Sequence, residues 1–154
     1  MALAVRTAAR VLSILLMASA LRSVRGQARP EEVVFTSNGL QLHGFLWRPS
    51  ETGPFPAILW NHGSEKYPGS EPALAKFYTG HSYVFFVPHR RGQGRSPGPY
   101  IQDLVAQAPP FARGQRMMQL QDEEVVDVIA ALGFLKSQPF VDPSRLGLSA
   151  AITC

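Results

Sequence analysis

The first half of the chain alternates short apolar runs with turn-forming residues. Runs 33–36 and 40–47 are separated by Ser37-Asn38-Gly39. An Asn-Gly pair between two such runs indicates a tight turn, so these runs predict an antiparallel hairpin at a sheet edge. Runs 57–61 and 83–87 are almost uninterruptedly apolar, which is typical of parallel strands buried on both faces. With a short helix expected around 71–78, they predict a β-α-β unit with a right-handed crossover.

The second half changes to helical spacing. Segment 89–99 is a loop by composition, and 100–114 is expected to be irregular because Pro109-Pro110 interrupts it. Segment 115–137 has apolar residues largely on one helical face, with its acidic residues predicted on a solvated face. The apolar set is Met118, Val125, Val126, Val128, Ile129, Leu132 and Leu135, and the acidic set is Asp122, Glu123, Glu124 and Asp127. Residues 145–149 predict a third buried strand, so the expected fold is α/β with a mostly parallel sheet.

The N-terminal segment has the composition of a targeting sequence. Residues 1–26 contain four arginines and no acidic residue, with an apolar run over 11–21. This pattern is typical of a secretory signal peptide, and the run is too short to cross a bilayer. We therefore expect a signal peptide at 1–26, a linker at 27–32 and a partial domain at 33–154. A secreted or periplasmic protein is expected, with no membrane span after signal removal, and an organelle presequence is the alternative.

Charge and cysteine content exclude several classes of function. The net charge of +4 comes from the four arginines of residues 1–26, since the remaining 11 basic residues face 11 acidic ones. Nucleic-acid binding, which needs a concentrated basic face, is therefore not expected. The single cysteine, Cys154, allows no internal disulfide, and no Cys/His cluster has metal-ligand spacing. The glycines of 92–98 lack a phosphate-binding ending, and Pro97 and Pro99 prevent a helix there. No metal or cofactor is expected.

Two motifs follow the two buried strands. His62-Gly63-Ser64 comes after strand 57–61, and Arg91-Gly92-Gln93-Gly94-Arg95-Ser96 comes after strand 83–87. With the helix 115–137 and the segment 140–145, they make residues 33–148 resemble the N-terminal half of an α/β-hydrolase. The likeness is to the dienelactone hydrolase and prolyl oligopeptidase-like (peptidase S9-type) branch. It implies an oxyanion hole at Gly63, Ser64 and Glu65, with the N–H of Ser64 or Glu65 as donor. It also implies that the loop 91–96 shapes the rim of the site.

The family's nucleophile elbow, G-x-S-x-G, would fall at about 150–154. The chain has Ala-Ala-Ile-Thr-Cys there, with Ile152 in the place of the serine. A shifted alignment over 147–151 makes Ser149 the candidate catalytic nucleophile. Neither Thr153 nor Cys154 has a neighbouring base in the sequence that would activate it. The four histidines (His43, His62, His81 and His89) precede the elbow and match no catalytic position. The domain is therefore expected to be truncated near its nucleophile strand.

Two functions remain open from the sequence. The first is a serine hydrolase of the α/β-hydrolase type, acting on a small-molecule ester or peptide-like acyl bond and incomplete in this chain. The second is a non-catalytic remnant or binding module with the same framework. Ester hydrolysis that is abolished by a serine-reactive phosphonate would separate the two, because only the hydrolase needs an activated serine.

Overall fold

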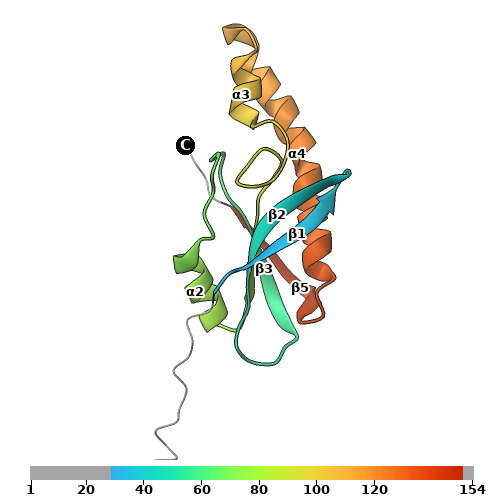
Figure 1. Cartoon of the computed structure of the whole chain (residues 1–154). Helices are drawn as coiled ribbons and strands as arrows, with labels where there is room; N and C mark the ends of the chain where they lie inside the picture. The colour runs from blue at the N-terminus through green and yellow to red at the C-terminus, as the bar shows by residue number, and fades with distance from the viewer. Residues whose placement is uncertain (1–28, 151–154) are drawn as a thin grey trace, which may run out of the picture.

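A computed structural model describes residues 29–150 of the chain (Figure 1). The predicted signal peptide and residues 151–154, including Ile152, lie outside this range. The elements in chain order are β1 (Glu31–Ser37), β2 (Leu40–Trp47), β3 (Phe55–Asn61), α2 (Pro72–Gly80), β4 (Val84–Pro88), α3 (Ile101–Ala106), the 3-10 turn η1 (Pro110–Ala112), α4 (Arg113–Lys136) and β5 (Val141–Ala150).

The five strands form one sheet in the order β1-β2-β4-β3-β5. β1 and β2 are an antiparallel hairpin whose turn residues Asn38 and Gly39 both have positive φ, 45° and 78°, as a type I′ turn requires. β2 also pairs antiparallel with β4, whereas β3 is parallel to both β4 and β5. The predicted fold class, a mostly parallel sheet with an N-terminal antiparallel hairpin, is confirmed.

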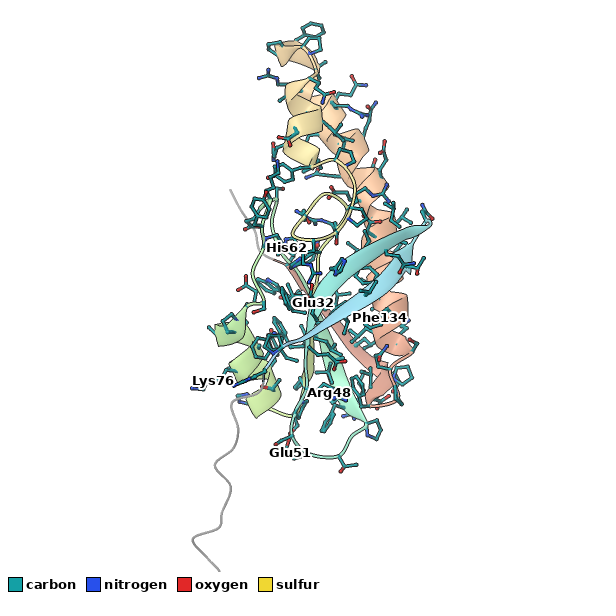
Figure 2. All side chains as sticks on the ribbon, in the orientation of Figure 1. Glu32, Arg48, Glu51, His62, Lys76 and Phe134 are labelled. Atoms are coloured by element: carbon teal, nitrogen blue, oxygen red, sulfur yellow. The ribbon has the colours of Figure 1, made fainter. Side chains whose placement is uncertain are left out.

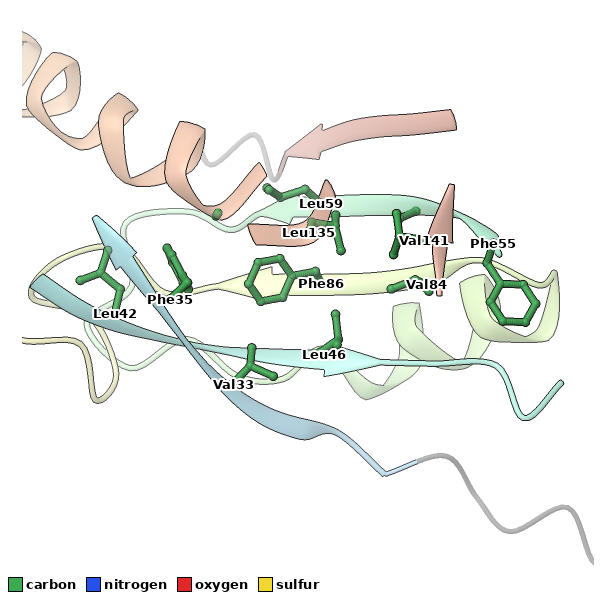
Figure 3. Close-up of a cluster of buried hydrophobic side chains, with 12 residues drawn as sticks. Val33, Phe35, Leu42, Leu46, Phe55, Leu59, Val84, Phe86, Leu135 and Val141 are labelled. Atoms are coloured by element: carbon green, nitrogen blue, oxygen red, sulfur yellow. The ribbon is translucent and has the colours of Figure 1, made fainter. Parts of the chain in front are cut away.

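Helices cover both faces of the sheet because successive strand residues point to opposite sides. On the α4 face, Phe134 of the helix packs against Phe35 and Phe86, with ring centroids 6.0 and 5.5 Å away. Figure 3 shows Phe35 and Phe86 within this larger cluster of buried side chains. On the other face, Tyr78 of α2 stacks on Phe85 at 5.1 Å. No helix among residues 29–150 is long and apolar enough to cross a membrane.

The expectation that 100–114 is irregular was wrong. α3 and η1 occupy this segment, and the two prolines begin η1, with Pro109 as its N-cap and Pro110 as its first residue. α3 forms because Ile101 and Val105 are buried against Leu120 of α4, in a small apolar cluster of its own. Six residues are too few for a helical period to show in the sequence.

The buried face of α4 also differs from the prediction. Glu124 and Asp127 were expected on a solvated face, yet they are 6% and 0% exposed. Met118, Val125 and Ile129, expected to be buried, are 61%, 50% and 62% exposed. The helix is rotated in this way because the two carboxylates meet arginines that follow β4. The face that packs inward consists of Leu120, Glu124, Asp127, Ala131 and Leu135.

Candidate oxyanion site

Two loops meet at one edge of the sheet. β3 and β4 are adjacent and parallel, so the segments that follow them, 62–66 and 89–99, leave the sheet side by side. The carboxyl ends of parallel strands are where open α/β sheets place ligands. Figure 2 shows His62 at this position, between the sheet and the α3 end of the molecule.

Side chains of the second loop hold carbonyl groups of the first. The Arg90 guanidinium donates to the carbonyl of Gly63 at 2.7 Å. The Gln93 amide donates to the carbonyl of Glu65 at 3.2 Å and more weakly to that of Gly63 at 3.4 Å. Gln93 is fully buried, so these hydrogen bonds are shielded from competing water. The loop 62–66 is therefore fixed through its carbonyl oxygens.

The carbonyls of Ser64 and Lys66 are also engaged. The Tyr100 hydroxyl donates to the carbonyl of Ser64, and the N–H of Gly94 donates to that of Lys66 at 2.8 Å. Within residues 29–150, by contrast, no acceptor is found for the N–H of Ser64 or of Glu65. Four successive carbonyls are therefore occupied, whereas neither predicted donor meets an acceptor among the described residues.

Arg90 connects the loop to α4. It donates to the Asn61 side chain at 2.8 Å and forms an ion pair with Glu124 at 3.0 Å. The side chains of Arg90 and Glu124 are only 12% and 8% exposed. Burial raises the pKa of Glu124, against the opposing effect of Arg90. Arg90 therefore joins the end of β3, the loop 62–66 and α4 through one guanidinium group.

Arg91 forms a second buried connection to α4. Its backbone N–H, Nε and Nη2 donate to the Asp127 carboxylate at 3.0, 2.9 and 2.8 Å. The Ser37 hydroxyl at the end of β1 donates to the same carboxylate at 2.7 Å. Burial alone would raise the pKa of Asp127, but the hydrogen bonds from Arg91 and Ser37 outweigh burial and lower it. The fold therefore favours the deprotonated, charged form of Asp127.

The loop 89–99 is itself shaped by glycine and serine. A Cβ on Gly92 would lie 2.2 Å from the Pro99 carbonyl oxygen, and φ at Gly92 is +72°. The Ser96 hydroxyl donates to the His89 carbonyl at 2.8 Å and accepts the N–H of His43 at 2.9 Å, which ties the loop to β2. These contacts fix the shape of the Arg-Gly-x-Gly-x-Ser segment, and its role at the rim of the site stays a prediction.

His62 is buried next to the predicted donors. Its side chain is 3% exposed, and its Nδ1 lies 3.0 Å from the Gly63 carbonyl. Nε2 is buried without a described partner, and the His89 ring is perpendicular at 5.6 Å. Burial, with smaller contributions from Arg90 and His89, lowers the pKa of His62 to about 4. His62 is therefore a neutral imidazole at neutral pH and adds no charge to the site.

A cavity of about 430 Å³ opens between the loop 62–66 and α4. Its polar lining includes Asn61, Arg90 and Glu124, and its apolar lining includes Ile101 and Val128. A mixed lining of this kind suits a small organic ligand with one polar group. The cavity borders the predicted oxyanion residues Gly63 and Ser64, and Glu65 follows them in the exposed part of the loop.

Ser149 lies in β5, opposite Trp60 of β3. Paired residues of neighbouring strands share a face, so its side chain points to the α2 side of the sheet. The Ser149 hydroxyl makes no hydrogen bond with another described residue. Ala150, the last residue of β5, pairs with Asn61 and so ends beside the start of the oxyanion loop. The role of Ser149 as nucleophile stays a prediction, and the elbow beyond residue 150 is outside the described range.

The supporting residues around the loop were missed from sequence. Arg90, Tyr100, Glu124 and Asp127 all contribute, and no supporting role was predicted for any of them. The only available signal was the combination of two adjacent arginines after a strand with two acidic residues three apart on a helix. That spacing alone does not distinguish a buried network from two charged surfaces.

Comparison with known proteins supports the architecture. No family model matches the chain, and no curated protein matches it either. Among solved structures, it is similar to acetyl xylan esterase 1 from Thermoanaerobacterium sp. JW/SL YS485, with a TM-score of 0.63 and 20% identity. It is also similar to an acylaminoacyl peptidase from Pyrococcus horikoshii (0.56, 18%) and to the α/β-hydrolase GrgF from Penicillium sp. sh18 (0.54, 25%).

The matches cover most of this chain and a minority of each neighbour. For the three proteins in the order given, the match takes in 84%, 80% and 79% of this chain. It takes in 42%, 19% and 37% of the respective neighbour. The chain therefore spans less than half the length of the solved structures that it resembles here.

Proposed function

We propose that this chain, which has the α/β-hydrolase fold, supplies the oxyanion-binding loop of a serine hydrolase acting on ester or peptide-like acyl bonds. One observation carries the proposal. The four carbonyls of residues 63–66 are held by Arg90, Gln93, Gly94 and Tyr100, while the N–H groups of Ser64 and Glu65 have no described acceptor. A loop fixed in this way can accept negative charge without rearranging.

The chemistry follows from where charge develops. When a serine hydroxyl attacks an acyl carbon, the carbonyl oxygen becomes an oxyanion, and N–H groups already aimed at it lower the barrier. One such donor is typically worth about 2.7–4 kcal/mol in transition-state stabilisation. In this chain, the N–H groups of Ser64 and Glu65 would donate to the oxyanion. The neutral His62 beside them would add no charge of its own. Ser149 is our candidate nucleophile.

The acyl substrate class is supported by the names of the neighbours. One is an acetyl xylan esterase and another an acylaminoacyl peptidase, so the shared framework serves both ester and amide chemistry. The cavity beside the loop has room for a small acyl or leaving group. We propose a small-molecule ester or peptide-like substrate on these grounds.

The test is hydrolysis of 4-nitrophenyl acetate together with labelling by a fluorophosphonate. In Arg90→Met the loop loses its link to α4, and we expect kcat/KM to fall by about 10- to 100-fold, less than the roughly 100- to 1,000-fold typical of removing an oxyanion donor outright. Arg95→Met is the matched control, because Arg95 is 70% exposed and pairs with Glu32 away from the loop. Ser149→Ala should abolish both turnover and labelling. Turnover that is unchanged in Arg90→Met would contradict the proposed role of the loop.

A non-catalytic binding module is the second candidate. It is favoured by the position of Ser149 within a strand, since a hydrolase nucleophile belongs on a sharp strand-to-helix turn. For this alternative we expect neither turnover nor fluorophosphonate labelling of the purified protein. Binding of a small ester, detected by perturbation of the Ser64 and Glu65 amide resonances, would then support the alternative.

A further inference from the structure

The connection between α3 and α4 projects away from the sheet (Figure 1). We call residues 106–118 the α3–α4 tip. Two of its large apolar side chains face solvent, since Phe111 is 92% exposed and Met118 is 61% exposed, whereas Met117 packs against the α3–α4 cluster. Pro109 and Pro110, next to Phe111, are exposed as well. Soluble proteins rarely hold several large apolar groups in water at one projecting point without a use for them.

The tip is an ordered structure. α3 packs on α4 through Ile101, Val105 and Leu120, and Arg113 Nε donates to the Ala108 carbonyl at 3.2 Å. None of the three buried cluster residues lies in the tip itself. Phe111 therefore makes no contribution to this packing, and it is carried outward on a supported turn between two helices.

The charge of the tip has one sign. Residues 104–121 contain Arg113 and Arg116 and no acidic residue. Arg113 is exposed, and no carboxylate among residues 29–150 forms an ion pair with either arginine. Exposed apolar side chains therefore stand next to two cations that have no internal counter-charge.

We infer that the α3–α4 tip docks on an anionic lipid surface, with Phe111 entering the headgroup region and Arg113 and Arg116 facing lipid phosphates. The strength of peripheral membrane binding scales with the apolar area buried and with the attraction to anionic lipids, and the tip offers both. A projecting turn suits a deformable headgroup layer. It suits a protein partner less well, because a standard protein interface buries about 1,600 Å² over matched surfaces. A second copy is disfavoured because two cationic tips repel each other.

The test compares variants of the full chain on lipid vesicles. Co-sedimentation is measured with phosphatidylcholine vesicles, with and without phosphatidylglycerol. Removing the inserted ring in Phe111→Ala should weaken binding to anionic vesicles about tenfold. Neutralising one charge in Arg113→Gln should weaken it about fivefold. Phe77→Ala is the matched control, because Phe77 is also an exposed phenylalanine, at 58%, but lies on α2. We expect this control to bind as the wild type does.

A second measurement locates the contact. Residues 1–26 carry arginines and an apolar run of their own, so the comparison between variants of the same chain is what isolates the tip. Amide hydrogen exchange over residues 107–118 should slow on anionic vesicles, whereas exchange in α2 should not. Equal binding of Phe111→Ala and wild type, unchanged exchange at the tip, or protection only by an acidic protein would each overturn the inference. None of these readouts uses turnover, so the result is independent of the proposed hydrolase activity.

Discussion

Asp127→Asn is the substitution that most directly tests how the site is supported. The wild-type carboxylate is fully buried and accepts four hydrogen bonds, one from Ser37 and three from Arg91. Asparagine has the same shape, but one of its two terminal atoms is an amide nitrogen that donates. Each carboxylate oxygen accepts two of the four hydrogen bonds, so the amide nitrogen would turn its N–H groups toward two donors. Arg91 would also lose its counter-charge.

The expected loss can be bracketed. Removing one partner of a buried ion pair typically destabilises a protein by 3–5 kcal/mol. Arg91 is 23% exposed, so water would solvate part of its unpaired charge and bring the loss to about 3 kcal/mol, the lower end. The effect should depend on pH. The pKa of Asp127 is lowered on folding, so its contribution to stability is present above the unfolded pKa of about 4 and is lost as pH falls through the folded pKa.

The assay is urea denaturation of wild type, Asp127→Asn and the control Asp122→Asn at neutral and acidic pH. Asp122 lies on the same helix but is exposed, so we expect its substitution to change the free energy of unfolding by less than about 0.5 kcal/mol. The difference between wild type and Asp127→Asn should shrink as pH falls below about 4. Equal stability of wild type and Asp127→Asn at neutral pH would refute the reasoning, as would a loss of unfolding free energy in Asp127→Asn that does not change with pH.

Two further substitutions test the buried His62 and the shape of the loop 89–99. The pKa of His62 is lowered to about 4 in the fold, so the unfolded chain binds more protons below pH 6.5. Stability should therefore rise with pH between about 4 and 6.5, by up to about 3 kcal/mol. His62→Gln should remove this portion of a pH-dependent melting profile, and substitution of the exposed His81 should not. Gly92→Ala should destabilise by about 2–4 kcal/mol, because its Cβ would collide with Pro99 at a positive φ. In contrast, Gly133→Ala, on α4 with open space around it, should stabilise by about 0.5–1 kcal/mol in the same denaturation assay.

The strands were predictable from sequence because their signals are local. The Asn38-Gly39 turn specified the hairpin, and the apolar runs specified β3 and β4, which the sheet buries between helices. The orientation of α4 was not predictable. Counting apolar residues places Val125 and Ile129 inside, but the helix instead buries Asp127 against an arginine from a distant loop. A pairing between residues far apart in sequence leaves no mark in the periodicity of either segment.

The same limit applies to the candidate site. The His-Gly turn after β3 was found because a glycine ending a buried strand is a local pattern. The hydrogen bonds that orient the turn come from Arg90, Gln93 and Tyr100, and their geometry depends on how the loop 89–99 folds back. The position of the loop could be predicted from the motif, whereas the groups that hold its carbonyls in place could be found only in three dimensions.

The two ion pairs made by α4, with Arg90 and with Arg91, also set the position of the helix along its own axis. Arg90 and Arg91 are neighbours in the chain, and their partners Glu124 and Asp127 lie about one helical turn apart. Sliding α4 by one turn, about 5.4 Å, would bring Asp127 toward Arg90 and leave Arg91 opposite the apolar Ala131. A helix held only by apolar contacts would tolerate such a shift more readily than one whose shift leaves a buried charge without its partner. Because Arg90 also holds Gly63, the alignment of a helix along the sheet is transmitted to the position of the loop 62–66 and of its proposed oxyanion donors.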